Sequence, residues 1–405
     1  MNATPASPRD LRDRLRELRS APRAEGLERR AEAIAAAAAR FLDPTDPLRR
    51  RTEEDLPRAT GFSPRMIREA LWRIFAPITA SELSALAAEL QGEPVRVLAI
   101  VSAGNVPGVA LPKTVLALTA GAACLVKAAS REPVLPVLFA EALADVDPVL
   151  ARSLAVLWWP GGTAAVEREL AAADSLVAYG SDDALGALAA FAPPRFVGHG
   201  HRLSIACVRL GDDAPVDELA RAAALDVALY DQLGCLSPQC LYVEGRPADR
   251  EQLVARLAAA LQELSETLPR GSIPAEASTA IRRLRDEYEW REISGEAVRG
   301  RRSAHGTDWT ILVDPDPHFR STPLYRTVFV RPLESIAALR ESLGRADALV
   351  ESIGIGPWSE DAARRIASAM HAPRIAPLGA MQSPDLRWRQ GGRHPLAGIA
   401  ATDRR

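Results

Sequence analysis

The chain of 405 residues is predicted to fold as an α/β protein with two doubly wound lobes. Short apolar runs rich in β-branched residues alternate with segments of helical spacing, which is typical of parallel strands joined by crossover helices. This alternation begins near Pro94, is interrupted at Pro193-Pro194 and then begins again. A chain of this length also exceeds what one compact core usually supports, so two lobes are expected.

The first 90 residues are expected to be helical, because their apolar residues recur at helical spacing. Ser63 followed by Pro64 predicts one helix start, with serine as the N-cap and proline at the first helical position. Beyond them, strands are expected at residues 95–101, 124–127, 154–158 and 176–179, and helices at 112–119, 132–144, 163–172 and 182–190.

The second lobe is expected to repeat this alternation after residue 203. Strands are predicted at residues 204–208, 240–244, 310–313, 327–330 and 348–353, and helices at 216–229, 252–268, 336–343 and 359–370. Residues 271–302 are charged and are expected to be less regular. The tail from His371, with its Pro, Gly and Arg residues, is expected to be a loop.

Composition and charge argue against several classes of protein. A net charge of −2 gives no electrostatic reason to expect binding to nucleic acid or an anionic membrane. No stretch reaches the roughly 18 apolar residues of a membrane span, and the polar N-terminus lacks the apolar core of a signal peptide. The four cysteines have no zinc-site spacing, so we expect reduced thiols, no metal and a cytoplasmic location.

Four polar segments are expected at or near the carboxyl ends of strands, where doubly wound sheets bind ligands. In the turn after the first strand, the Asn105 amide can donate to an oxyanion or can simply stabilise the turn. Lys127 ends a buried strand, which is costly for an ammonium group unless it meets an anion, ribose hydroxyls or water. Alternatively, its side chain can extend to the surface.

The other two segments contain a Gly-Ser helix start and a loop cysteine. Gly180 and Ser181 suit a pyrophosphate at a helix N-terminus, although Ser181 or Asp182 can equally be a plain helix cap. Cys235 lies beside Gly234 on a loop before a strand, where a thiol can be exposed and reactive. The remaining cysteines lie in apolar runs and are expected in the core: Cys124, Cys207 and Cys240.

Taken together, these segments resemble the aldehyde dehydrogenase superfamily and, more narrowly, the bacterial acyl-CoA reductases of the LuxC type. The order of features matches: an Asn-x-Pro turn, a strand-ending lysine, a Gly-Ser helix start, a Gly-rich bend and a Gln-x-x-Cys-x-x-Pro loop. The resemblance extends from about residue 20 to the C-terminus. Its motifs are residues 104–108, 198–202 and 231–239 and the tail 374–395 with Trp388 and Gly391-Gly392-Arg393.

The resemblance implies an aldehyde-dehydrogenase-like fold with the active site between the lobes. Cys235 would be the nucleophile, and Asn105 with the backbone N–H of Cys235 would form the oxyanion hole. Lys127, Gly180 and Ser181 would bind the nicotinamide cofactor. The implied division is a helical region at 1–90 packing on the cofactor lobe, a Rossmann-like cofactor-binding domain at 91–203, a catalytic domain at 204–370 and a C-terminal tail at 371–405.

Two departures from the superfamily pattern are informative. Aldehyde-oxidising members carry a glutamate in the Gly-rich bend that activates water, whereas residues 195–203 contain no carboxylate. An acyl group on Cys235 should therefore hydrolyse slowly. Many NAD-preferring members place a glutamate three residues after the lysine, whereas Ser130 and Arg131 stand here. A 2′-phosphate is then not repelled, which favours NADPH.

The resemblance thus implies NADPH-dependent reduction of a long-chain fatty acyl thioester to an aldehyde through an acyl group on Cys235. The donor is expected to be acyl-CoA or an acylated partner protein, and the enzyme a homo-oligomer, either a dimer or a tetramer. His199 or His201 can move a proton or contact CoA, or they can satisfy the backbone of the bend. The alternatives are a CoA-acylating aldehyde dehydrogenase acting on shorter aldehydes, a cofactor-free cysteine acyltransferase or thioesterase, and a catalytically silent subunit.

Overall fold

The computed structural model describes residues 4–22, 24 and 26–400, and its chain begins with helices, as predicted. Four of these helices begin at Ser, Asp or Thr side chains that accept a backbone N–H of the first turn. Ser63 is one of these caps, and Pro64 occupies the first helical position. The helices are α1 (Pro8–Ser20), α2 (Leu27–Ala39), α3 (Pro47–Thr60), α4 (Pro64–Phe75) and α5 (Ala80–Ala88).

The first sheet is parallel, with the strand order β3-β2-β1-β4-β5. Its strands are β1 (Val97–Val101), β2 (Ala123–Lys127), β3 (Leu154–Leu157), β4 (Ser175–Tyr179) and β5 (Phe196–His199). The connecting helices are α6 (Leu111–Ala120), α7 (Val134–Val146), α8 (Pro148–Ala151), α9 (Ala164–Glu167) and α10 (Asp182–Ala189). The segment 195–203, expected to be a Gly-rich bend, contains strand β5. This segment has no clear apolar period, and its pairing with β4 makes it a strand.

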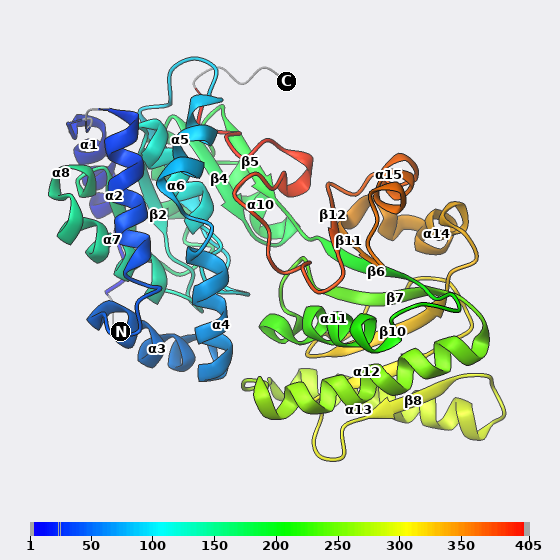
Figure 1. The fold of residues 1–405 in the computed structure, drawn as a ribbon. Coiled ribbons are helices and arrows are strands. Elements are labelled where there is room, and N and C mark those ends of the chain that lie inside the picture. Colours follow the sequence, from blue (N-terminus) through cyan, green and yellow to red (C-terminus); the bar gives the residue numbers. More distant parts are fainter. Residues whose placement is uncertain (1–3, 23, 25, 401–405) are drawn as a thin grey trace.

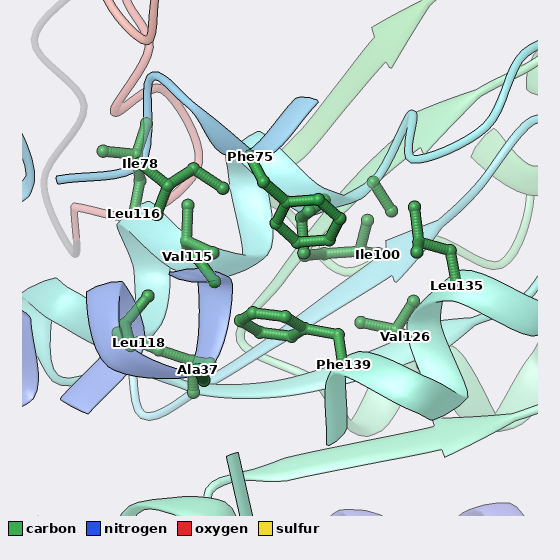
Figure 2. Packing of buried hydrophobic residues seen from close by; sticks show 14 of the residues in the cluster. Ala37, Phe75, Ile78, Ile100, Val115, Leu116, Leu118, Val126, Leu135 and Phe139 are labelled. Atoms are coloured by element: carbon green, nitrogen blue, oxygen red, sulfur yellow. The ribbon is translucent and has the colours of Figure 1, made fainter. Parts of the chain in front are cut away.

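Helices cover both faces of the first sheet (Figure 1). One core cluster joins α2 and α4–α7 to the sheet, and Figure 2 shows Phe75 of α4 and Phe139 of α7 packed beside Ile100 and Val126. The second cluster places Leu11 and its apolar neighbours of α1 against the opposite face. The N-terminal helices therefore belong to the core of this lobe.

The second sheet has the strand order β12-β11-β6-β7-β10-β9-β8, and it is parallel except for the β8–β9 pair. Its strands are β6 (Leu203–Arg209), β7 (Pro238–Glu244), β8 (Arg299–Arg302), β9 (Thr310–Val313), β10 (Thr327–Pro332), β11 (Val350–Gly356) and β12 (Arg374–Pro377). Helices α11 (Val216–Ala228) and α12 (Pro247–Thr267) cover one face. The other face is covered by α13 (Ala275–Ile293), α14 (Ile336–Leu343) and α15 (Glu360–Ala369).

Two segments of this lobe differ from the sequence prediction. Residues 271–302, expected to be irregular, contain the 19-residue helix α13 and the edge strand β8. The charged surface of α13 hides a narrow apolar side on which Leu284 and Tyr288 face the sheet. The tail, expected to be a loop, begins with β12, which is a strand because β11 supplies its hydrogen bonds.

The tail segment, residues 378–400, crosses back from β12 to the first lobe (Figure 1, red). The Lys113 ammonium of α6 donates to the Ala397 carbonyl at 3.0 Å, and the Val95 N–H donates to the Ile399 carbonyl at 2.8 Å. This segment ties the two lobes together. Across the part of the chain that the structure describes, no helix combines the length and apolar character needed to cross a bilayer.

Candidate active site

The candidate residues gather where the carboxyl edge of the first sheet faces the amino edge of the second. Asn105 and Lys127 follow or end strands of the first sheet. Cys235 instead precedes β7, next to the start of β6, where Ser204 pairs with Pro238. The expectation that all four segments lie near carboxyl ends is therefore wrong for Cys235, because the two lobes contribute opposite sheet edges.

Cys235 is half-buried on the loop between α11 and β7. The Ser204 hydroxyl donates to its carbonyl oxygen at 2.7 Å and so fixes the loop to β6. Burial raises the pKa of the Cys235 thiol to about 12, and the Glu351 carboxylate raises it further, against the opposing Arg202 and Arg374. The resting thiol is therefore protonated at neutral pH. The other cysteines are buried, as predicted: Cys124, Cys207 and Cys240.

Asn105 is exposed on the turn after β1, and its amide reaches the cysteine loop. Its Nδ2 donates to the Leu233 carbonyl at 2.9 Å, two residues before Cys235. An amide held against the cysteine loop can also donate to an oxyanion that forms beside that loop. The turn of the first lobe and the loop of the second thus meet two residues before the candidate nucleophile.

The chain just before Cys235 has an unusual backbone. Tyr230, Asp231 and Gln232 have φ values of 53°, 49° and 64°, the left-handed region that such residues rarely adopt. Two buried contacts hold this turn: Asp231 pairs with Arg326 at 2.9 Å, and the Thr327 N–H donates to the Gln232 side chain at 2.8 Å. These contacts to β10 and the residue before it set the path of the chain into the cysteine loop.

A pocket of about 240 Å³ lies beside this loop, between the lobes. Its lining includes Phe62 from the N-terminal helical region, Arg131 from the first lobe, and Leu233 and Tyr325 from the second. Because Leu233 is the carbonyl partner of Asn105, the pocket adjoins the candidate oxyanion site. The pocket therefore offers space for part of a substrate next to the cysteine loop.

The expected cofactor residues lie along the carboxyl edge of the first sheet. The Lys127 side chain is buried, and this burial lowers its pKa against the opposing effect of Glu167. The Ser130 hydroxyl accepts from the Trp158 indole at 3.2 Å, whereas its neighbour Arg131 lines the pocket. The two adjacent side chains therefore have different surroundings.

Gly180 and Ser181 follow β4, at the start of α10. The Ser181 hydroxyl accepts from the Ala184 N–H at 3.3 Å and caps that helix. Asp182 and Asp183 are in the first turn, so the side chains here do not favour an anion, although backbone N–H groups do. The alternative of a plain helix cap thus describes the contact that Ser181 makes in the structure.

The two histidines of the expected bend lie at the end of β5 and just after it. His199 stacks on Tyr179 with ring centroids 4.8 Å apart, and burial lowers its pKa to about 3, helped by Lys113 and other cations. Its ring is therefore neutral and a weak proton acceptor at neutral pH. His201 is exposed, and its backbone N–H donates to Asp182 at 3.3 Å.

Sequence reasoning missed a buried carboxylate on the strand that is linked to the cysteine loop through Ser204. Glu351, the second residue of β11, has no exposed surface, and its charge contributes to the raised pKa of the cysteine. A signal was present in the sequence, because a glutamate inside the apolar run at residues 349–355 is unusual in a buried strand. What the sequence lacked was any indication that this strand start lies next to the cysteine loop.

Comparison with known proteins identifies the family and the fold of the chain. The acyl-CoA reductase (LuxC) family model matches residues 91–401. The long-chain acyl-protein thioester reductase of Aliivibrio fischeri is 25% identical over 275 residues, which cover 66% of this chain and 55% of that protein. The protein of the same name from Photorhabdus laumondii is 27% identical over 286 residues, covering 68% and 57%. The chain thus spans little more than half the length of these curated relatives.

Solved structures with a similar fold include aldehyde dehydrogenases. An aldehyde dehydrogenase from Brucella melitensis superposes with a TM-score of 0.73 at 16% identity, covering 93% of this chain and 83% of that one. An NAD-dependent benzaldehyde dehydrogenase from Corynebacterium glutamicum gives a TM-score of 0.72 at 16% identity, covering 92% and 86%. The predicted aldehyde-dehydrogenase-like fold is confirmed. Because the family model also spans both lobes, the chain belongs to the acyl-CoA reductase (LuxC) family.

Proposed function

We propose that this protein reduces a long-chain fatty acyl thioester to the aldehyde with NADPH, through a thioester on Cys235. The observation that carries the proposal is the hydrogen bond from the Asn105 amide to the Leu233 carbonyl on the cysteine loop. It joins the candidate oxyanion donor of one lobe to the loop that carries the candidate nucleophile of the other. Membership of the acyl-CoA reductase family supports the same chemistry.

In the proposed acylation, the Cys235 sulfur attacks the carbonyl carbon of the acyl donor. The Asn105 amide and the backbone N–H of Cys235 stabilise the oxyanion, and the donor thiol leaves when the tetrahedral intermediate collapses. The pocket lined by Phe62, Leu233 and Tyr325 would admit the donor to the cysteine. No carboxylate lies in the segment 195–203, so the acyl group should resist hydrolysis until it is reduced.

A nicotinamide cofactor fits one part of the first sheet better than another. Lys127 is a buried ammonium at the end of β2, and such a group suits ribose hydroxyls or a phosphate. At α10 the contact would use backbone N–H groups near Gly180, because the Ser181 hydroxyl already accepts a bond from its own helix. When bound, the cofactor supplies the hydride that converts the thioester to the aldehyde.

The relatives named above are called long-chain acyl-protein thioester reductases. We therefore propose that the acyl donor is either an acylated protein or acyl-CoA. We further propose that the enzyme is a homo-oligomer and acts in the cytoplasm. The half-buried Cys235, beside a pocket open between the lobes, is compatible with a thioester presented on a flexible arm.

The test is the absorbance of NADPH after mixing the protein with acyl-CoAs of increasing chain length and with an acylated carrier protein. The proposal predicts acyl-dependent oxidation of NADPH and formation of aldehyde, both lost in Cys235→Ala. Acylation of Cys235 without NADPH oxidation would instead indicate an acyltransferase or thioesterase. Activity confined to short aldehydes, CoA and the oxidised cofactor would indicate a CoA-acylating dehydrogenase.

A further inference from the structure

Glu351 is a buried carboxylate that the proposed chemistry does not yet use. Its side chain has no exposed surface, and both of its oxygens accept the Gly391 N–H of the tail segment, at 2.8 and 3.2 Å. The Arg202 guanidinium lies 3.7 Å away, and Arg374 of β12 contributes a second, more distant positive charge. Burial nevertheless dominates and raises the pKa of Glu351 above its usual value.

A β-bulge determines the position of this residue. In the pairing of β11 with β6, Val350 is opposite Leu203 and Ser352 is opposite Ser204, so Glu351 is the extra residue between two consecutive partners. Bulges of this kind redirect one side chain and are frequent beside active sites. Without the bulge, regular alternation would place each residue after Glu351 on the face of the sheet opposite to the one it now occupies.

The same strand start is connected to the cysteine loop. The Ser204 hydroxyl donates to the Cys235 carbonyl at 2.7 Å and accepts the Ser352 N–H at 3.1 Å. Ser352 directly follows Glu351, so the Ser204 hydroxyl joins the backbone next to Glu351 to the cysteine loop. The negative charge of Glu351 also raises the pKa of the Cys235 thiol. Thiol and carboxylate thus lie in one buried region, with Arg202 and Arg374 as the neighbouring cations.

We propose that Glu351 is the catalytic proton acceptor for the Cys235 thiol in acylation, a role that rests on the proposed function. As the sulfur–carbon bond to the acyl group forms, the Cys235 proton moves to a Glu351 oxygen. When the bond from the acyl carbon to the donor sulfur breaks, the same proton passes to the leaving thiolate. The step balances without another reactant, and Glu351 returns to its charged form.

Electrostatics favours this exchange over simple ionisation of the thiol. A thiolate formed beside an ionised Glu351 would place two negative charges in one buried region, which is unfavourable in a medium of low polarity. Transfer of the proton from sulfur to Glu351 keeps a single negative charge in the pair. A thiol with a high pKa can therefore attack at neutral pH, because its proton has an acceptor during the reaction.

Burial also explains why this carboxylate need not cause hydrolysis of the acyl group. A general base for hydrolysis must hold a water molecule against the thioester. Glu351 has no solvent-exposed surface, and the Gly391 N–H contacts both of its oxygens. In this position it is shielded from bulk water, while Ser204 and Ser352 tie its strand to the cysteine loop.

The test is the acetylation of Cys235 by p-nitrophenyl acetate, followed by phenolate release between pH 6 and 9.5, with Cys235→Ala as the blank. The native rate should rise as Glu351 ionises and then become flat. In Glu351→Gln the amide oxygen can still accept the Gly391 N–H, but the proton acceptor is lost. The acetylation rate of this variant at pH 7 should be roughly 100-fold or more below the native rate, the usual range for a general base. As the pH is raised, its rate should increase about tenfold per pH unit, because hydroxide then removes the thiol proton.

Asp226→Asn is the matched control. Asp226 is a second buried carboxylate, and its oxygens accept the backbone N–H groups of Gly379 and Met381 in the tail segment. The bond from Met381 measures 3.0 Å. Burial raises the pKa of Asp226 to about 7. It holds the same segment at Gly379 and Met381, whereas Glu351 holds it at Gly391. Its variant should keep the shape of the native pH profile, even if the tail is loosened.

The outcomes separate this inference from the proposed function. A Glu351→Gln profile parallel to the native one, lowered equally at every pH, would show that Glu351 only supports the tail and would overturn the inference. Native acetylation with the expected profile but no NADPH oxidation with any acyl donor would reject the reduction and leave the role of Glu351 supported. No acetylation of native Cys235 would overturn both.

Discussion

Asn105 offers a test of the oxyanion site that the structure makes quantitative. A primary amide has two N–H donors, and one donor of Asn105 is directed to the Leu233 carbonyl at 2.9 Å. In the proposed reaction the other meets the developing oxyanion. Asn105→Ala removes both donors, so the transition state loses one contact and the cysteine loop loses one anchor.

The two losses differ in size. Removal of one oxyanion donor usually lowers kcat by roughly 10²–10³-fold, which is about 2.7–4 kcal/mol. A lost neutral hydrogen bond destabilises a fold by only ~0.5–1.5 kcal/mol. Asn105 is exposed, so its truncation leaves no cavity in a core. The rate loss should therefore greatly exceed the loss of stability.

The assay is single-turnover acylation of Cys235 together with kcat and KM, and thermal unfolding reports stability. Asn105→Asp is the matched variant, because it keeps the shape but places an acceptor where a donor is needed, and it should be at least as slow as Asn105→Ala. A native rate in Asn105→Asp, or an effect confined to KM with kcat intact, would refute the oxyanion role, since the contact strengthens only as charge develops.

Four further predictions concern the nucleophile, its acyl intermediate, the cofactor and the loop before the cysteine. Peptide mapping after incubation with acyl-CoA alone should find the acyl group on Cys235, whereas Cys240→Ala should still be acylated and lose only ~1–2 kcal/mol of stability; label on Cys240 would contradict the assignment. Without NADPH the acyl-enzyme should persist, and fast steady release of thiol from the native enzyme with acyl-CoA alone would count against this. The native enzyme should prefer NADPH to NADH by roughly ten- to a hundredfold in kcat/KM, as one charge-assisted contact allows. The variant Ser130→Glu should shrink or reverse that ratio. Equal use of both cofactors by both proteins would exclude a ribose contact at this strand end. Asp231→Asn leaves the fully buried Arg326 without its carboxylate partner and should lower the free energy of unfolding in urea by ~3–5 kcal/mol, so a loss below about 1 kcal/mol would show that the pair is not needed.

Local patterns in the sequence were sufficient for most of the fold. Ser63-Pro64 starts α4 as predicted, because a cap and a fixed φ act within one turn. The four strands predicted before residue 180 pair in a parallel sheet, because a buried strand needs a continuous apolar run that is visible in the sequence. The segments that failed, β5, β8 and β12, lie at or near sheet edges and depend on their partner strands for hydrogen bonds.

The sequence by itself determined which residue types the chemistry has available. The Asn105 turn, the Lys127 strand end and the Cys235 loop could all be recognised from spacing, because each depends on neighbours within a few positions. The structure then decided which side chains meet. Asn105 contacts the cysteine loop through Leu233, whereas Ser130 and Arg131, adjacent in sequence, have different surroundings.

Glu351 shows most clearly what only the tertiary structure could decide. Its position depends on the register between β11 and β6, on a bulge in that register, and on a tail segment that returns across both lobes. Each of these is a pairing between segments far apart in the chain, and no local pattern encodes such a register. The sequence therefore indicated the candidate nucleophile, while the packing of β11, β6 and the tail segment placed a buried carboxylate near its loop.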